Sequence, residues 1–183
     1  MNHLEALIHR LGRIRVYLAA AALLLLGIGC HELSKAERDM LQQSPEALCK
    51  GIIKTYNGQD VKAFTELCLP YGDLKQMMQT ADLPATAKRE SLSKVGAGGY
   101  ARSIQDSLSH VLVQDSLQWG GASYEQFQPT RKPIEVAPGY KMHLGNLVLT
   151  QGGRRWTQQI TLVEVGKGRY FMGGFSPFSR SKP

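Results

Sequence analysis

The fold is decided near the C-terminus, where residues 151–175 read QGGRRWTQQITLVEVGKGRYFMGGF. Residues 156–165 are rich in the aromatic and β-branched residues that favour strands, and they predict one long strand. Gly152-Gly153 and Gly166-Lys167-Gly168 flank this strand at the places where hairpin turns are expected. The stretch therefore predicts consecutive antiparallel strands joined by short glycine turns.

Upstream of this stretch the apolar residues recur with the period of two that is typical of strands. Apolar residues alternate from Tyr140 to Leu144, and they resume in the opposite phase at Leu147, as they would beyond a β-bulge at Gly145-Asn146. Residues 134–136 alternate between flanking prolines, which is typical of a short edge strand. Together these segments predict one antiparallel sheet.

Before about residue 115 the apolar residues recur at helical spacing instead. Ser44-Pro45-Glu46 has the residues of a helix start, and Asn57-Gly58-Gln59-Asp60 breaks the helical pattern. Two runs recur every four residues, namely Leu48, Ile52 and Tyr56, and Tyr100, Ile104, Leu108 and Leu112. Helices followed by a sheet predict an α+β domain whose N-terminal helices pack on one face of the sheet.

The composition is that of one modest globular domain. The chain has 183 residues, a formal net charge of +7, 43% apolar residues and 20% charged residues. These values exclude a disordered tail, a collagen-like repeat, a coiled coil and a protein with several membrane spans.

The N-terminus has the layout of an export signal. Arg10, Arg13 and Arg15 precede residues 16–28, an uncharged apolar run. This run is shorter than the roughly 20 residues that a membrane-spanning helix needs. A basic start, a short apolar middle and small residues at its end are typical of a secretory signal.

The end of that signal resembles the lipobox of bacterial lipoproteins. Leu26-Gly27-Ile28-Gly29 precedes Cys30, and in the lipobox the cysteine receives fatty acyl chains such as palmitate and becomes the first mature residue. Gly27 departs from the pattern, which prefers leucine at that position. The alternative is an uncleaved signal anchor with its positive charges on the cytoplasmic side. Both interpretations place the rest of the chain outside the cytoplasm.

This resemblance implies four segments. Residues 1–29 are a signal peptide, residues 30–43 a tether from the lipidated Cys30, residues 44–176 the folded domain, and residues 177–183 a basic tail. Several acyl chains anchor a protein stably to a membrane. We therefore expect a protein that faces the periplasm of a bacterial cell envelope, on the outer membrane rather than the inner one.

Two cysteines remain if Cys30 carries lipid. Cys49 and Cys68 are nearly equidistant from Gly58, so an antiparallel helical hairpin with its turn there brings them to similar heights. A disulfide between them is sterically plausible in an oxidising compartment. The alternative is two separate buried thiols that act as small apolar groups.

The order of these elements resembles the NTF2-like superfamily, as found in small bacterial lipoproteins of unknown function. The resemblance rests on Tyr56-Asn57-Gly58-Gln59-Asp60 between two helices and on the hairpin with Ile160-Thr161-Leu162-Val163 and Gly168-Arg169-Tyr170-Phe171. It implies a cone in which a curved sheet wraps a pocket. Members include enzymes, ligand carriers and protein-binding adaptors, so the fold leaves the function open.

Few residues suggest chemistry. Residues 96–101 fit the pattern G-x-G-x-x-A, but no buried strand precedes them, so a loop is expected. Asp106 and His110 lie four residues apart opposite the apolar stripe, as a solvated pair would. His143 faces away from its apolar neighbours, toward solvent or a pocket. Neither the histidines nor the cysteines have metal-site spacing, so we expect no metal and no other cofactor.

The C-terminal part is basic. Its residues include the four that we predict for contact with an anion or an acidic partner, namely Arg154, Arg155, Lys167 and Arg169. Anionic lipid headgroups, lipopolysaccharide or an acidic protein would be suitable partners. The plainer interpretation is a solvated face, and an exported protein rarely meets nucleic acid.

The function expected from the sequence is that of a lipid-anchored envelope protein. It is expected to be non-catalytic and to bind a small apolar ligand or another envelope protein. The first alternative is a single-span scaffold subunit of a secretion or envelope complex. The second is an enzyme with an acid–base dyad in the pocket, which requires a buried ionisable side chain there.

Overall fold

The computed structural model describes residues 33–180, apart from residues 87, 89–95, 114–118 and 167. The chain divides into two compact units, residues 1–31 and 32–183, and the described residues belong to the second unit. The proposed signal segment and Cys30 therefore lie outside the described residues, as does Lys167.

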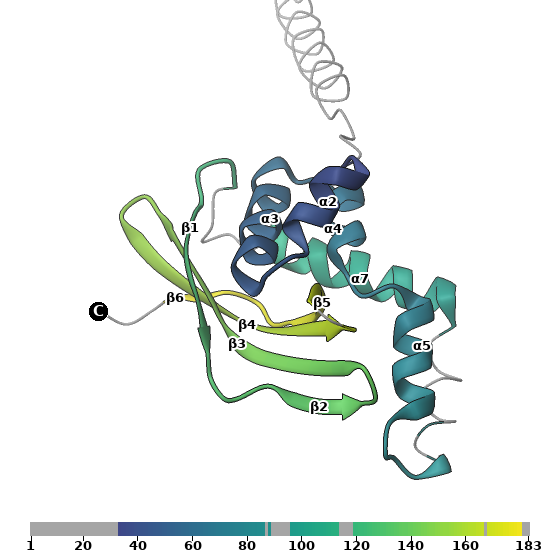
Figure 1. Ribbon diagram of the computed structural model, residues 1–183. Helices are drawn as coiled ribbons and strands as arrows, with labels where there is room; N and C mark the ends of the chain where they lie inside the picture. Colours follow the sequence, from purple (N-terminus) through teal and green to yellow (C-terminus); the bar gives the residue numbers. More distant parts are fainter. Residues whose placement is uncertain (1–32, 87, 89–95, 114–118, 167, 181–183) are drawn as a thin grey trace, which may run out of the picture. The chain divides into compact units, whose positions relative to one another are not determined.

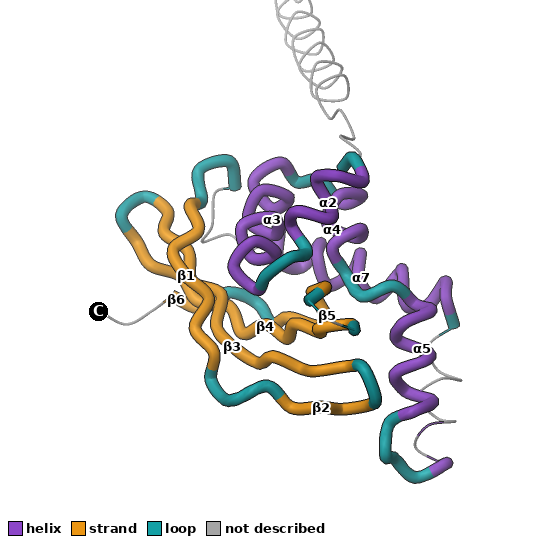
Figure 2. The backbone as a smooth tube through the Cα atoms, in the orientation of Figure 1, coloured by secondary structure: helices purple, strands orange, loops and turns teal. Residues whose placement is uncertain are grey.

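The second unit is an α+β domain, as the sequence predicts (Figures 1 and 2). Its described helices are α2 (Lys35–Leu41), α3 (Pro45–Gly58), α4 (Val61–Leu67), α5 (Tyr71–Thr80) and α7 (Ala97–Leu112). Its described strands are β1 (Ser123–Pro129), β2 (Ile134–Ala137), β3 (Tyr140–Gln151), β4 (Arg154–Val165), β5 (Arg169–Phe175) and β6 (Ser179–Arg180).

The predicted helical hairpin is confirmed. Ser44 caps α3 by accepting a 3.1 Å hydrogen bond from the amide of Ala47. Gln59 adopts the left-handed conformation with a φ of 51°, which ends the helix. Asp60 then caps α4 by accepting a 2.9 Å hydrogen bond from the amide of Ala63. Capping of both helices thus fixes the turn between them.

Residues 96–101 form the start of a helix. The sequence predicts an interruption at these glycines, but Gly96 is the N-cap of α7 and residues 97–101 belong to the helix. The 16 residues of α7 bury Leu108 and Val111 in the core, and this packing of an amphipathic face outweighs the low helix propensity of glycine.

The sheet is curved, antiparallel and unclosed. Its main strands follow the order β1-β3-β4-β5, while β2 pairs with β3 and β6 pairs with β4. The central pair runs without interruption from Tyr140 opposite Val165 to Gln151 opposite Arg154. In Figure 1, α2, α3 and α4 lie over one face of this sheet.

The predicted bulge at Gly145-Asn146 is wrong. Both residues pair in register with β4, opposite Ile160 and Gln159. The apolar phase changes along β3 because the strand is buried on opposite faces at its two ends. Tyr140 belongs to a cluster with residues of α5, whereas Leu147 belongs to the main core beneath α3. A burial pattern cannot by itself distinguish a bulge from a change of packing partner.

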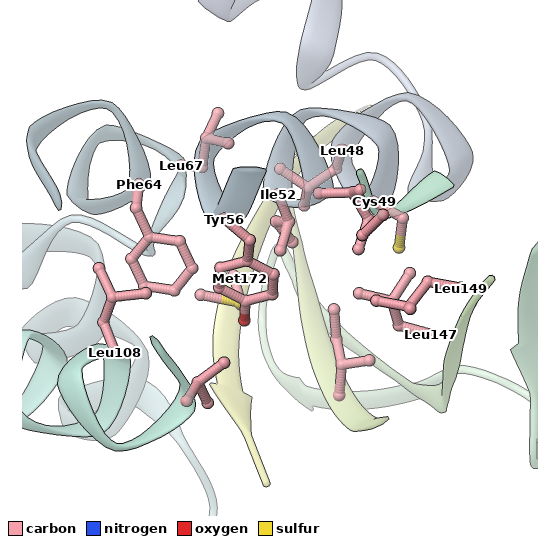
Figure 3. Close-up of a cluster of buried hydrophobic side chains, with 14 of the residues drawn as sticks. Leu48, Cys49, Ile52, Tyr56, Phe64, Leu67, Leu108, Leu147, Leu149 and Met172 are labelled. Carbon is pink, nitrogen blue, oxygen red and sulfur yellow. The ribbon is translucent and has the colours of Figure 1, made fainter. Parts of the chain in front are cut away.

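The main core lies between the helices and the sheet. Tyr56, Phe64 and Leu147 are fully buried there. The ring of Tyr56 contacts those of Phe64 at 5.4 Å, Trp119 at 5.1 Å and Phe178 at 5.9 Å, measured between centroids. Figure 3 shows Leu147 and Leu149 of β3 facing Cys49 and its helix.

Candidate ligand-binding site

A hollow of about 570 Å³ lies over the middle of the sheet. It is bordered by the β1–β2 loop, by β3 and β4, and by the end of β5. The described residues that line it are Thr130, Arg131, Leu144, Gly145, Asn146, Gln159, Ile160, Thr161, Gly174, Phe175 and Ser176. Its volume is within the range of pockets that hold small ligands.

The alternation of the strands places the polar side chains of the hollow on the face opposite the main core. Asn146 pairs with Gln159, and Leu144 pairs with Thr161. These positions alternate with the core residue Leu147, so their side chains point away from the main core. We call this the outer face of the sheet. Near β2 the outer face is covered by α5, and the hollow lies beyond that cover.

One rim of the hollow is fixed by Thr130, in the loop between β1 and β2. Its amide donates a 2.9 Å hydrogen bond to the carbonyl of Leu144, and its hydroxyl donates a 3.1 Å bond to the same oxygen. Arg131 follows directly and is exposed. The hydrogen bonds of Thr130 to β3 therefore fix the backbone from which the side chain of Arg131 extends.

The opposite rim is fixed by Ser176. Its amide donates to the carbonyl of Gln159 at 2.9 Å, and its hydroxyl accepts from the amide of Gln159 at 3.2 Å. Its carbonyl accepts a 2.8 Å bond from the side chain of Gln158. These bonds hold both rims in place without a ligand, which lowers the ordering cost of binding.

Gln158 joins this rim to the helical layer. It has no exposed surface, and its side-chain oxygen accepts a 3.2 Å hydrogen bond from the hydroxyl of Tyr56 on α3. Burial raises the pKa of Tyr56, so the phenol stays protonated and remains a donor.

The lining of the hollow offers hydroxyls, amides and one cation. Thr130, Thr161 and Ser176 supply hydroxyls, and Asn146 and Gln159 supply amides. Both kinds of group can donate and accept hydrogen bonds. Arg131 is the sole charged residue among the described residues of the lining, which contain no carboxylate, imidazole or thiol. The arrangement suits a polar ligand that is uncharged or anionic.

The described basic residues predicted for partner contact, Arg154, Arg155 and Arg169, do not form one patch. Arg154 and Arg155 begin β4, whereas Arg169 lies opposite the last residue of that strand, roughly 35 Å away along it. Arg155 forms an ion pair with Glu125. Contact of these residues with an anion or an acidic partner stays a prediction.

Arg169 is engaged within the domain. Its guanidinium donates a 3.1 Å hydrogen bond to the side chain of Gln42 and lies 5.2 Å from the centre of the Phe171 ring. Gln42 is itself buried. Arg169 thus helps to hold the end of α2 against β5.

His143 is half-buried on the side of the main core. Its Nε2 lies 3.0 Å from Oε2 of Glu164, and its ring contacts that of Tyr170 edge-on at 5.3 Å. The side chains of His143 and Glu164 are 14% and 13% exposed. Neither residue lines the hollow. Glu164 could not be recognised from the sequence as the partner of His143, because the pairing depends on the register of two strands.

The other candidate residues lie apart from the hollow. Asp106 and His110 are exposed on α7. Within residues 33–180, apart from the gaps given above, no three His, Cys, Asp or Glu side chains are grouped closely enough to bind a metal ion. In the same part of the chain, no helix combines the length and apolarity needed to cross a membrane.

The two described cysteines are separate buried thiols. Cys49 lies on α3, and Cys68 ends α4 with its sulfur 3.5 Å from the carbonyl oxygen of Phe64. Burial raises the pKa of Cys68 to about 12 and that of Cys49 further. The structure thus has the two cysteines as separate buried thiols, which is the alternative to the disulfide. The disulfide stays a prediction for the exported protein.

No family model matches the chain, and neither the curated proteins nor the solved structures include a significant match to it. The geometry of the hollow is therefore the basis for a functional proposal.

Proposed function

We propose that this protein is a lipid-anchored component of the bacterial cell envelope that binds a small polar ligand in the hollow on the outer face of the sheet. The observation that carries the proposal is the lining of that hollow. Hydroxyl and amide groups from three parts of the sheet converge there beside Arg131, and both rims are fixed by hydrogen bonds.

The lining also supports a role without catalysis. General acid–base catalysis needs a group whose proton can be exchanged near neutral pH, such as an imidazole or a carboxyl group. A serine or threonine nucleophile needs an adjacent base. The described residues of the lining include neither kind of base. The side chains of Asn146, Gln159 and Thr161 are then suited to binding a ligand, whereas the hydroxyls of Thr130 and Ser176 hold the rims.

The polar lining changes the kind of ligand that the sequence suggests. From the sequence, a small apolar ligand or another envelope protein is expected, bound through the sheet and the pocket of the cone. The polar side chains of this hollow are on the opposite face of the sheet from the main core. We retain the NTF2-like domain as a proposal, because a curved antiparallel sheet with helices on one face is compatible with it.

The anchor in this proposal comes from the first 30 residues. A lipidated Cys30 would hold the domain at the membrane, and the residues up to Leu33 would connect it to α2. In an envelope the domain would then meet ligands on the periplasmic side of the membrane.

The test is a screen of uncharged and anionic polar fragments by ligand-observed NMR, with the full-length chain in detergent micelles. We expect fragments that bind the wild type to lose at least about tenfold in affinity in Gln159→Phe, where the new ring fills the hollow. Gln105→Phe is the matched control, because Gln105 is an exposed glutamine on α7 that does not line the hollow.

A second pair of variants tests whether the positive charge of Arg131 contributes to binding. Arg131→Gln should weaken the binding of anionic fragments, and Lys132→Gln should not, although it removes the same charge from the adjacent exposed residue. Equal effects of the two variants, or fragment binding that survives Gln159→Phe, would show that the hollow is not the site.

A further inference from the structure

A second, smaller cavity of about 150 Å³ lies between α7 and the edge of β5. Its described lining residues are Cys68, Tyr100, Ser103, Ile104, Ser107, Met172, Gly173, Gly174 and Phe175. A cavity of this volume is small for a ligand of its own, since ligand pockets usually exceed about 300 Å³.

The two cavities meet at the end of β5. Gly174 and Phe175 line both of them. Gly174 lies opposite Thr161 of the hollow, and a Cβ atom built on Gly174 would meet no other atom within 4 Å. No side chain of this residue therefore separates the hollow from the second cavity.

The edge of β5 is covered by other parts of the chain as far as Met172, where the second cavity begins. The amide of Leu69 donates a 2.9 Å hydrogen bond to the carbonyl of Met172, and the amide of Tyr170 donates a 2.8 Å bond to Gln42. The backbone of β5 is thus occupied at these residues by other parts of the chain. Beyond Met172 the cavity takes the place of such a neighbour.

The second cavity repeats the chemistry of the hollow. Ser103 and Ser107 supply hydroxyls from α7, and Tyr100 adds a phenol that donates a 2.8 Å bond to the carbonyl of Leu69. Cys68 is a protonated thiol near neutral pH, because burial raises its pKa to about 12. Phe175 lines both cavities, and its ring packs edge-on against that of Phe64 on the side of the main core.

We propose that the two cavities form one elongated site for an oligosaccharide, which crosses β5 over Gly174. Sugar hydroxyls both donate and accept hydrogen bonds, as do the serine, threonine, asparagine and glutamine side chains of the lining. The proposal rests on the proposed function, since the hollow holds the larger part of the ligand. It names the class of ligand and its direction across the sheet.

An extended peptide fits these observations less well. A peptide strand binds by pairing its backbone with a free sheet edge. Here the edge of β5 is occupied at Tyr170 and Met172, which leaves at most residues 173–175 for pairing, and the polar groups of the hollow are side chains on the sheet face. Side-chain hydroxyls and amides on a face favour a ligand that carries its own hydroxyls along its length.

The test is calorimetric titration of the full-length chain, in a detergent without sugar headgroups, with chito-oligosaccharides of two to five units. We expect the affinity to rise by at least about tenfold from the disaccharide to the tetrasaccharide. Ser107→Phe should abolish this rise, because the new ring fills the second cavity that the longer saccharides reach. Ser109→Phe on the same helix is the matched control.

Gly174→Val provides a second variant at the junction, where the added Cβ atom meets no other atom within 4 Å. This variant should also abolish the rise in affinity with the length of the saccharide. If the dependence on length is missing, or persists in both variants, the elongated site is refuted while the hollow remains a binding site. If fragments bind the hollow but no saccharide does, or tetra-alanine binds more tightly than the tetrasaccharide, the ligand class is refuted.

Discussion

The hydroxyl of Tyr56 on α3 donates a 3.2 Å hydrogen bond to the side chain of Gln158 on β4, and both side chains have no exposed surface. The amide nitrogen of Gln158 then donates to the carbonyl of Ser176, at the rim of the hollow. Through this buried pair the helical layer holds one wall of a site that lies on the far face of the sheet.

Gln158→Leu should therefore destabilise the protein. It leaves the hydroxyl of Tyr56 and the carbonyl of Ser176 without their partner, and an unpaired buried polar group costs about 1–3 kcal/mol. Urea unfolding gives the free energy of unfolding of the variant.

The double variant Tyr56→Phe, Gln158→Leu provides the control. Its loss in free energy of unfolding should be about 1 kcal/mol smaller than the sum of the losses in the two single variants. The reason is that the double variant also removes the hydroxyl that Gln158→Leu leaves unpaired. Strictly additive losses would show that the hydrogen bond contributes nothing.

Gly145 should not tolerate a side chain. A Cβ atom at this residue would lie 2.5 Å from the ring of Phe127 and 2.6 Å from the carbonyl oxygen of Gln128. Gly145→Ala should then lower the free energy of unfolding by about 1–3 kcal/mol or more through overpacking. Gly174→Ala, where the new methyl group meets nothing within 4 Å, should change it by less than about 0.5 kcal/mol. A similar loss in both variants would contradict the close approach of β1 to β3.

Stability should fall in alkaline solution. Burial raises the pKa of Cys68 from 9.0 to about 12 and that of Tyr100 from 10.0 to about 12. Above pH 9 the unfolded chain loses these protons while the folded chain retains them, so ionisation favours unfolding. The free energy of unfolding should be insensitive to these groups below pH 9 and decrease between pH 9 and 12. Tyr100→Phe should reduce the slope above pH 10, and an unchanged slope would contradict the burial of this phenol.

Both thiols should react slowly in the native protein. Cys49 and Cys68 are buried, and their raised pKa values keep the reactive thiolate scarce near neutral pH. Maleimide labelling at pH 7.5 should accelerate strongly in urea, and rapid labelling without urea would contradict the burial. In urea without reductant, labelling of both residues identifies free thiols, whereas labelling of neither identifies the disulfide.

Lipid attachment should depend on Cys30. An alkyne-bearing fatty acid fed to expressing cells should label the wild-type protein, and Cys30→Ala should carry no label and retain its N-terminal signal. Cys49→Ala is the control and should be labelled normally. Full-length Cys30→Ala that still resides in the membrane would favour the signal anchor over the lipoprotein.

Much of the fold could be predicted from local signals. Ser44 and Asp60 cap helices where their sequence context predicts it, and the glycine turns separate strands at the predicted places. These features depend on a few neighbouring residues. The change of buried face along β3 was misinterpreted, because it depends on α5, which packs on that strand from about 60 residues upstream.

The hollow could not be predicted in the same way. Asn146, Gln159 and Thr161 are ordinary polar residues at alternating strand positions, and the sequence contains no motif that distinguishes them. They converge only through the register of β3 with β4 and the position of the β1–β2 loop. The pairing of Asn146 with Gln159 would have indicated the hollow, but this pairing can be inferred only when the register of the β3–β4 hairpin is known.

The most direct test of the central claim uses the side-chain amide signals of Asn146 and Gln159 in NMR spectra of the isotope-labelled full-length chain. On titration with chitotetraose, both signals should shift in a saturable manner. The amide of Asn57, which is bonded to the carbonyl of Ala122 away from the hollow, should not move. Unmoved signals of Asn146 and Gln159 at saturating ligand, or shifts centred on another surface, would contradict the account.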